Sequence, residues 1–128
     1  MASQNNTGHQ FDKQHAVTLV ATAALAANRF VSYGGGAPVT VGAVGANDVQ
    51  GVTEHAAASG EAVSVITGYS ALVEASAAIA FGAFVTTDAA GLAAVGSTAN
   101  YCGRALGDAT AAGQLLEVQL LPHVHPVV

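Results

Sequence analysis

Short apolar runs rich in Val, Thr and Ala follow one another from Val17 onward, and clusters of Gly and polar residues separate them. Runs and breaks of this kind are typical of β-strands joined by tight turns. Alternation is clearest in LLEVQLL, where Leu116, Val118 and Leu120 share one face of the strand. The pattern predicts a mainly β protein with strands at 17–22, 29–33, 38–44, 49–53, 62–66, 71–75, 83–87, 91–95, 101–106 and 115–121.

The Ala-rich runs between these strands allow a competing helical interpretation, because Ala is the best helix former. Each run is shorter than the length at which an isolated helix becomes stable. We therefore expect one-turn helices at most, near 55–59 and 107–112, where Ala-rich segments follow a strand and stop at Gly60 and Gly113.

The strand pattern occurs twice along the chain. QGVTEHAAASGEAVSVI (50–66) and CGRALGDATAAGQLLEVQL (102–120) each join a short strand, a run of small residues, a Gly with a polar residue, and an alternating strand. A shift of 54 residues also places VTLVAT on ALVEAS. The sequence therefore predicts two duplicated halves, 17–66 and 71–120, that together build a compact β-barrel or sandwich, since neither half alone could bury a face.

The first fifteen residues differ from the rest, because they are polar and hold a single aromatic residue, Phe11. This composition predicts an extended or disordered arm. We divide the chain into a flexible N-terminal arm at 1–15, a single β domain at 16–122 and a C-terminal tail at 123–128. Phe11 is a candidate anchor on a partner, although a contact with its own domain is an equally good interpretation.

The amino-acid composition indicates which kinds of partner the chain can bind. Apolar residues make up 52% of the chain and charged residues only 9%, whereas a soluble domain carries about 25% charged residues. Extended apolar patches usually mark contact surfaces, so we expect a subunit of an assembly. The net charge of −5 opposes binding to nucleic acid, and every apolar stretch is too interrupted to cross a membrane. The polar start lacks a secretory signal, which predicts synthesis in the cytoplasm.

Residues that could carry chemistry are few. Lys13 is the only Lys and lies outside any Gly-rich loop, and the single Cys102 is expected to be a small buried hydrophobe. His55 has no nucleophile motif around it, so a solvated loop histidine is the better interpretation. His123 and His125 alternate and weakly suggest a metal site, but an ordinary tail explains them better. We predict no catalytic, cofactor or metal site.

Two arginines stand out in the body because charge is so sparse there. Arg104 precedes Asp108 within GRALGDATAAG, which favours an Arg–carboxylate pair within the domain or across an interface. Arg29 directly precedes Phe30. Arg and aromatic residues are enriched at binding hot spots, so these four residues and Phe11 are the candidate protein-interface residues. The alternative is that the arginines are surface cations that serve solubility.

Three segments resemble the phage capsid cement, or decoration, proteins: the pattern from Gly51 to Val65, AAIAFGAFVTTDAAGLA (77–93) and GRALGDATAAGQLLEVQLLP (103–122). The last is the most specific, through its order of small residues, Gly and final strand. The resemblance implies a β-barrel-like subunit that trimerises on the outside of a capsid at threefold or quasi-threefold positions and ties adjacent major capsid subunits together. It implies no catalytic residue or cofactor, and the arm and the HVHPVV tail depart from it.

We therefore expect a homotrimeric capsid-stabilising protein on the outer surface of a virion, with the major capsid protein and its own copies as partners. The first alternative is a receptor- or glycan-binding β module on a virion or cell surface, for which Tyr33, Tyr69 and Tyr101 are the aromatic candidates. The second is a small enzyme with its site at a subunit interface, using His55 or the histidines of the tail.

Overall fold

The protein is described by a computed structural model, which places residues 15–32, 40–41 and 49–121. These residues form strands and turns and no helix, so the mainly β prediction is confirmed. Each predicted run overlaps one strand. The strands are β1 (Ala16–Ala21), β2 (Phe30–Ser32), β3 (Thr40–Val41), β4 (Val49–Thr53), β5 (Ala62–Ile66), β6 (Ser70–Glu74), β7 (Phe84–Thr87), β8 (Ala93–Val95), β9 (Gly103–Ala105) and β10 (Leu115–Leu120).

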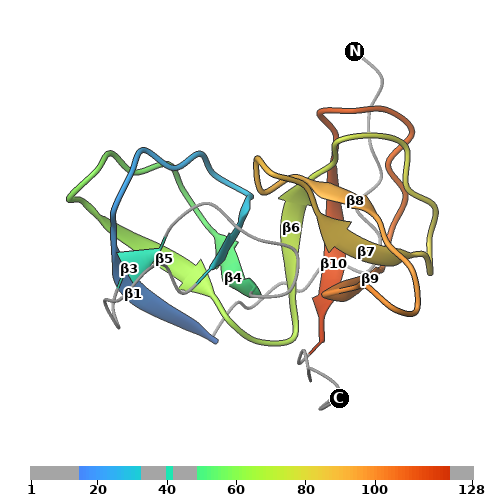
Figure 1. The fold of residues 1–128 in the computed structure, drawn as a ribbon, viewed down its shortest axis with the longest axis horizontal. Helices are drawn as coiled ribbons and strands as arrows, with labels where there is room; N and C mark the ends of the chain where they lie inside the picture. Colours follow the sequence, from blue (N-terminus) through green and yellow to red (C-terminus); the bar gives the residue numbers. More distant parts are fainter. Residues whose placement is uncertain (1–14, 33–39, 42–48, 122–128) are drawn as a thin grey trace.

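The described strands form two five-stranded sheets that lie side by side (Figure 1). One sheet has the order β2-β4-β5-β1-β3 and the other β6-β10-β9-β7-β8. All pairs are antiparallel except β1 with β3, which is parallel. The outer strands of the second sheet meet only through one isolated parallel bridge, Ala75 with Ala93, so the described part of the chain forms a sandwich-like fold and no closed barrel.

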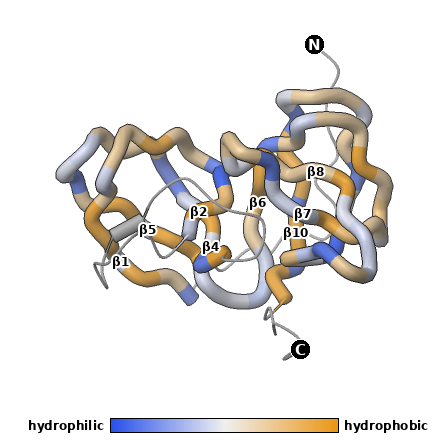
Figure 2. Tube along the Cα trace, in the orientation of Figure 1, coloured by the Kyte–Doolittle hydropathy of each residue, from blue (hydrophilic) through white to orange (hydrophobic). Residues whose placement is uncertain are grey.

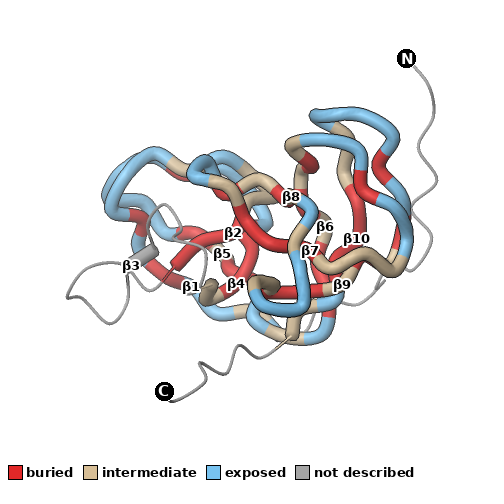
Figure 3. The backbone as a smooth tube through the Cα atoms, turned by 45° about the vertical axis from the view of Figure 1, so that its right-hand side comes forward, coloured by how far each residue is buried: buried red, intermediate tan, exposed pale blue. Residues whose placement is uncertain are grey.

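Both sheets contribute to one hydrophobic core. Leu116 and Val118 of β10 are buried, as the alternation of LLEVQLL predicts, and the corresponding Val63 and Val65 of β5 are buried in the first half. The apolar stretches follow the strands of both halves (Figure 2), and the buried stretches run along the same strands while the outer loops are exposed (Figure 3). The first and second halves of the chain therefore stabilise each other through shared packing.

The predicted one-turn helices near 55–59 and 107–112 are wrong. Ala57 exchanges backbone hydrogen bonds with Leu25, at 2.8 and 3.0 Å, and Ala109 exchanges two with Ile79, both at 2.8 Å. Ala57 and Ala109 are buried, with 7% and 3% of their surface exposed. A neighbouring loop thus supplies the hydrogen bonds that a helix would have made internally, and tertiary pairing overrides the helix propensity of Ala.

The two sheets contain corresponding features. The order β2-β4-β5-β1 in one matches β7-β9-β10-β6 in the other. The fifth strands differ in their main pairing, since β3 pairs with β1 whereas β8 pairs with β7 and meets the end of β6 only through the Ala75–Ala93 bridge. Gly60 and Gly113 occupy corresponding turns with φ of 89° and 88°. These correspondences support the predicted duplication of the two halves, which stays a prediction.

Candidate interaction surface

Arg104 lies on β9 and binds the backbone of a neighbouring turn. Its Nε and Nη2 atoms donate to the carbonyl oxygen of Gly82 at 2.9 and 2.7 Å. Its Cζ atom lies 4.2 Å from the centroid of the Phe84 ring, which places the guanidinium over an aromatic face. Two hydrogen bonds and a cation–π contact hold this side chain in one orientation.

Asp108 binds the same turn at a different backbone group. Its Oδ1 atom accepts a hydrogen bond from the Phe81 N–H at 2.5 Å. The sequence favours a direct pair between Arg104 and Asp108, but the structure shows these groups binding different backbone atoms of the turn formed by residues 80–83. The two charged residues are therefore linked through this turn.

The turn itself is held at every central position. The Ala83 N–H donates to the Ala80 carbonyl at 3.1 Å, and the Gly82 N–H donates to the Ala105 carbonyl at 2.8 Å. Gly82 has a φ of 82°, a left-handed conformation that glycine adopts without a steric penalty. Together with the bonds from Arg104 and Asp108, these contacts give the turn a single backbone conformation.

The held turn presents Phe81 to solvent. Its side chain is 67% exposed, the largest exposed fraction among the large apolar residues of the described chain. Phe81 is not among the predicted interface residues, because a Phe within AAIAFGAF looks like part of an apolar run. The available signal was the Gly that follows it, which ends the run in a turn and so brings the aromatic ring to the surface.

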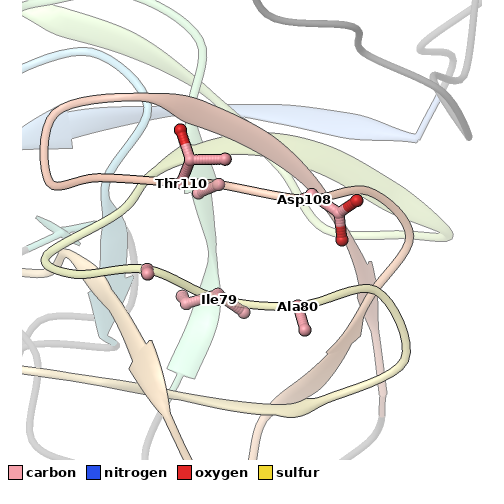
Figure 4. Close-up of a pocket in the computed structure, with 6 residues that line it drawn as sticks. Ile79, Ala80, Asp108 and Thr110 are labelled. Atoms are coloured by element: carbon pink, nitrogen blue, oxygen red, sulfur yellow. The ribbon is translucent and has the colours of Figure 1, made fainter.

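A shallow depression lies beside this turn, between the loops at 78–80 and 108–110 (Figure 4). Ala78, Ile79, Ala80, Asp108, Ala109 and Thr110 line it. The bridge between Ile79 and Ala109 forms its floor, and small side chains leave the surface open. The depression and Phe81 together form an apolar end of the second half.

The other predicted interface residues lie between the two halves of the chain. Phe30 is a core residue with 1% of its surface exposed, so its prediction as an interface residue is wrong. Arg29 is half-buried, and its Nη1 atom donates to the Ala90 carbonyl at 3.2 Å while its Nη2 atom lies 3.5 Å from Glu74 Oε2. Arg29 thus joins the first half to the second within one chain.

Several predictions lie wholly or partly outside the described residues. Phe11, almost all of the arm at 1–15, the tail at 123–128 with His123 and His125, and Tyr33 belong to this group. Of the other aromatic candidates, Tyr69 is 65% exposed and stacks edge to face with His15 at 4.3 Å, and the Tyr101 ring lies 5.0 Å from that of Phe84. These two tyrosines lie in different clusters and form no shared aromatic platform.

His55 and Cys102, which were considered as reactive residues, make structural contacts. His55 is exposed, its Nε2 atom accepts from the Ser64 N–H at 3.3 Å, and the Ser64 hydroxyl donates to Glu54 Oε1 at 2.6 Å. Because the hydroxyl binds the carboxylate, the imidazole is not placed as its base. Burial raises the pKa of the Cys102 thiol to about 12, so the thiol is protonated at neutral pH.

The placed residues contain no group of three or more potential metal ligands. None of the described residues lies in a helix that is long and apolar enough to span a membrane.

Comparison with known proteins gives two similarities. A family model described as phage cement protein matches residues 10–120. The solved structure of the head fiber gp8.5 N base of bacteriophage phi29 is similar, with a TM-score of 0.70 and 22% sequence identity over 83% of this chain and 92% of that chain. No curated protein sequence matches the chain.

These observations first define a class: the described residues form an all-β fold similar to that of a phage head component. The family model covers well over half of the sequence, so the chain belongs to the phage cement protein family. It is a structural protein of the phage capsid, it binds the head shell, and it is located at the capsid surface of the virion. The family resemblance predicted from the sequence is confirmed.

Proposed function

We propose that the chain is a homotrimeric decoration protein that binds the outer surface of the phage head at threefold or quasi-threefold positions. There it contacts the major capsid protein and stabilises the shell. The single observation that carries this proposal is the family match over residues 10–120. The sparse charge of the chain, 9% of its residues, supports it, because low charge suits a protein that is covered by neighbours.

The proposed mechanism is energetic and needs no reaction step. Each trimer contacts several capsid subunits at once, so the later contacts form within an assembled complex and need no new encounter. Linked contacts of this kind raise the overall affinity by about 10² to 10⁴ over a single contact. The bound trimer then resists separation of the capsid subunits beneath it, which strengthens the shell against internal pressure.

The N-terminal arm is proposed to provide part of the attachment. Fifteen extended residues reach about 50 Å, which is enough to cross onto a neighbouring subunit. A segment that orders on binding covers much of its partner at the cost of ordering entropy. Phe11 is its proposed anchor, because it is the only aromatic residue of a polar segment.

The test is co-sedimentation of purified protein with undecorated heads, followed by a count of bound copies. We expect saturable binding at a copy number that matches the threefold positions of the lattice. Binding at a number unrelated to these positions would contradict the proposed placement. A folded protein that does not bind heads at all would contradict the decoration function.

A variant lacking residues 1–15 tests the arm separately. We expect weaker occupancy on heads with an unchanged circular-dichroism spectrum, because the described strands begin at Ala16. The full chain with Phe11→Ser is the matched variant for the anchor. Unchanged occupancy of both variants would remove the arm from the attachment.

A further inference from the structure

The arm joins the β domain at a residue that the structure describes. His15 is the last residue of the arm predicted at 1–15, and Ala16 begins β1. The His15 carbonyl accepts two hydrogen bonds from Thr67, one from its N–H at 2.7 Å and one from its hydroxyl at 3.2 Å. The root of the arm is therefore bound to the connection at 67–69, which joins β5 to β6.

The connection at 67–69 fits closely around His15. A Cβ atom at Gly68 would lie 2.8 Å from the His15 Cβ atom, which is closer than real Cβ atoms approach, so only a residue without a side chain leaves room for His15. The ring of the next residue, Tyr69, lies 4.3 Å from the His15 ring between centroids, with the two planes at 85°. The connection thus contacts His15 through both its backbone and an aromatic side chain.

Tyr69 makes this contact from a strained backbone. Its φ is 60°, a left-handed conformation that a bulky side chain rarely adopts and that glycine adopts without a steric penalty. The side chain is 65% exposed, so burial in the core does not offset the strain. Strain of this kind persists where the surrounding structure or the function of the residue maintains it. The ring contact that Tyr69 makes in the described structure is the stack on His15.

His15 and Tyr69 occupy corresponding positions in the two halves. The shift of 54 residues that places VTLVAT on ALVEAS also places His15 on Tyr69. The Leu120 N–H donates to the Tyr69 carbonyl at 2.7 Å, as the Thr67 N–H does to the His15 carbonyl. The stacked pair therefore lies where the two halves meet, and the start of β1, the connection from β5 to β6 and the end of β10 lie along the same side of the molecule (Figure 1).

We propose that Tyr69 is a positioning residue for the N-terminal arm, which clamps His15 and so fixes the place and the direction from which residues 1–14 extend to the capsid. The strained backbone directs the ring onto His15, and the stack and the two hydrogen bonds from Thr67 hold the root of the arm before it binds. A root that is already held loses less conformational freedom on association. The inference rests on the proposed attachment through the arm and names the residue that directs it.

Limited digestion with trypsin tests the clamp without capsids. Lys13 is the only lysine and lies two residues before His15. The protease binds the chain on both sides of the bond that it cleaves, so the rate of cleavage after Lys13 reports how often His15 leaves the connection. We expect Tyr69→Gly to lose residues 1–13 about two- to tenfold faster than the unmodified chain, the range that loss of one aromatic pair gives. Mass spectrometry follows the shortened chain.

Three further variants control this measurement. Tyr69→Phe keeps the ring, and Phe81→Ser removes a similarly exposed ring, at 67%, from the turn at 80–83, so we expect both to be cleaved at the rate of the unmodified chain. Gly68→Ala opens the clamp by another route, because its Cβ atom displaces His15 while both rings remain, and we expect faster cleavage again. Urea unfolding checks that each variant is folded.

Co-sedimentation with undecorated heads measures the effect of the clamp on attachment. We expect the occupancy of Tyr69→Gly to fall toward that of the chain lacking residues 1–15, and Tyr69→Phe to bind as the unmodified chain does. An unmodified chain that does not bind heads would contradict the proposed function, whereas the digestion would still decide whether Tyr69 holds the root of the arm.

The proposal is overturned if Tyr69→Gly is digested at the rate of the unmodified chain. It is also overturned if Phe81→Ser is digested as fast as Tyr69→Gly, because cleavage would then report a general loss of stability. Faster digestion of Tyr69→Gly with unchanged occupancy on heads would overturn the positioning role, because the clamp would then hold the arm without directing its attachment.

Discussion

The turns at 26–29 and 80–83 show how one local structure serves two environments. Both have a left-handed residue at the same position, and its N–H donates to the carbonyl of the last residue of a strand, Thr53 of β4 or Ala105 of β9. Asn28 reaches the neighbouring half with its side-chain amide, whereas Gly82 has no side chain and is bound by Arg104. The backbone conformation is therefore set locally, and the side chains decide whether the turn faces the same chain or the solvent.

The largest expected effect concerns two glycines that occupy corresponding positions. A Cβ atom at Gly51 would overlap the Ile66 carbonyl oxygen, and one at Gly103 would overlap the Gln119 carbonyl oxygen. We expect Gly51→Ala and Gly103→Ala each to lower the free energy of unfolding by about 3 kcal/mol or more, because rigid backbone must move. Urea unfolding monitored by circular dichroism measures both.

Gly60→Ala and Gly113→Ala are the matched controls. Their added Cβ atoms would meet nothing within 4 Å, so the cost comes only from the φ values of 89° and 88°. This left-handed conformation costs a non-glycine residue about 1 to 2 kcal/mol. Equal costs within each pair would support equivalent positions in the two halves, whereas a large cost at Gly51 with none at Gly103 would contradict this equivalence.

The next effect concerns the junction between the halves. Arg29→Met removes the ion pair with Glu74 and the hydrogen bond to the Ala90 carbonyl while keeping much of the side-chain volume. We expect the free energy of unfolding to fall by about 1 kcal/mol, because the ion pair is partly buried while the hydrogen bond to the Ala90 carbonyl is exposed. A double-mutant cycle with Glu74→Gln isolates the pair itself, and a coupling of zero would show that Arg29 acts only through Ala90.

The strands were predictable because their information is local. Val63, Val65, Leu116 and Val118 alternate with polar residues and are buried, although Glu117 between the last two is buried as well. The Ala-rich segments were not, because Ala57 and Ala109 receive their hydrogen bonds from loops that lie far away in the sequence. Helix propensity depends on the local sequence, so it does not include a hydrogen-bond partner that only the folded chain supplies.

The candidate surface was predictable only in part. Rarity of charge drew attention to Arg104 and Asp108, and their nearness in sequence suggested a direct pair. The structure connects them through the backbone around Phe81, a relation that requires the Ile79–Ala109 bridge to bring the two loops together. Phe30 was misjudged because an aromatic residue beside an arginine fits a core strand as well as an interface.

A third prediction uses a position at which the halves differ in chemistry. Cys102 of the second half corresponds to Gln50 of the first. Burial raises the pKa of the Cys102 thiol from 9.0 to about 12. Between these values the unfolded chain loses the thiol proton and the folded chain keeps it, so stability falls as the pH rises.

At pH 10 this difference costs about 1 kcal/mol of the free energy of unfolding relative to neutral pH. We expect Cys102→Ala to unfold more easily at neutral pH, because it leaves a small cavity, but to lose less stability between pH 8 and pH 10. Parallel urea titrations of the two proteins at both pH values isolate the thiol from the lysine and tyrosine groups they share. The same pH dependence in both would contradict a buried, protonated thiol.

The smallest effect tests how the second-half turn replaces the strand that holds its counterpart. The Asn28 carbonyl is bound by the Glu74 N–H, and the Gly82 carbonyl is bound by the Arg104 guanidinium. Arg104→Lys keeps the charge but cannot donate from two atoms of a planar group, so we expect a loss of about 0.5 to 1 kcal/mol in the free energy of unfolding.

Arg104→Ala should cost slightly more, because it also removes the cation–π contact with Phe84. Amide hydrogen exchange gives the sharper measurement, since the Gly82 and Ala83 N–H groups report the opening of the turn directly. We expect faster exchange at these two groups in both variants, and unchanged exchange at Asn28, whose turn is held by β6. If the Asn28 group changed equally, Arg104 would stabilise the whole domain rather than this turn, and its role in holding Phe81 would be lost.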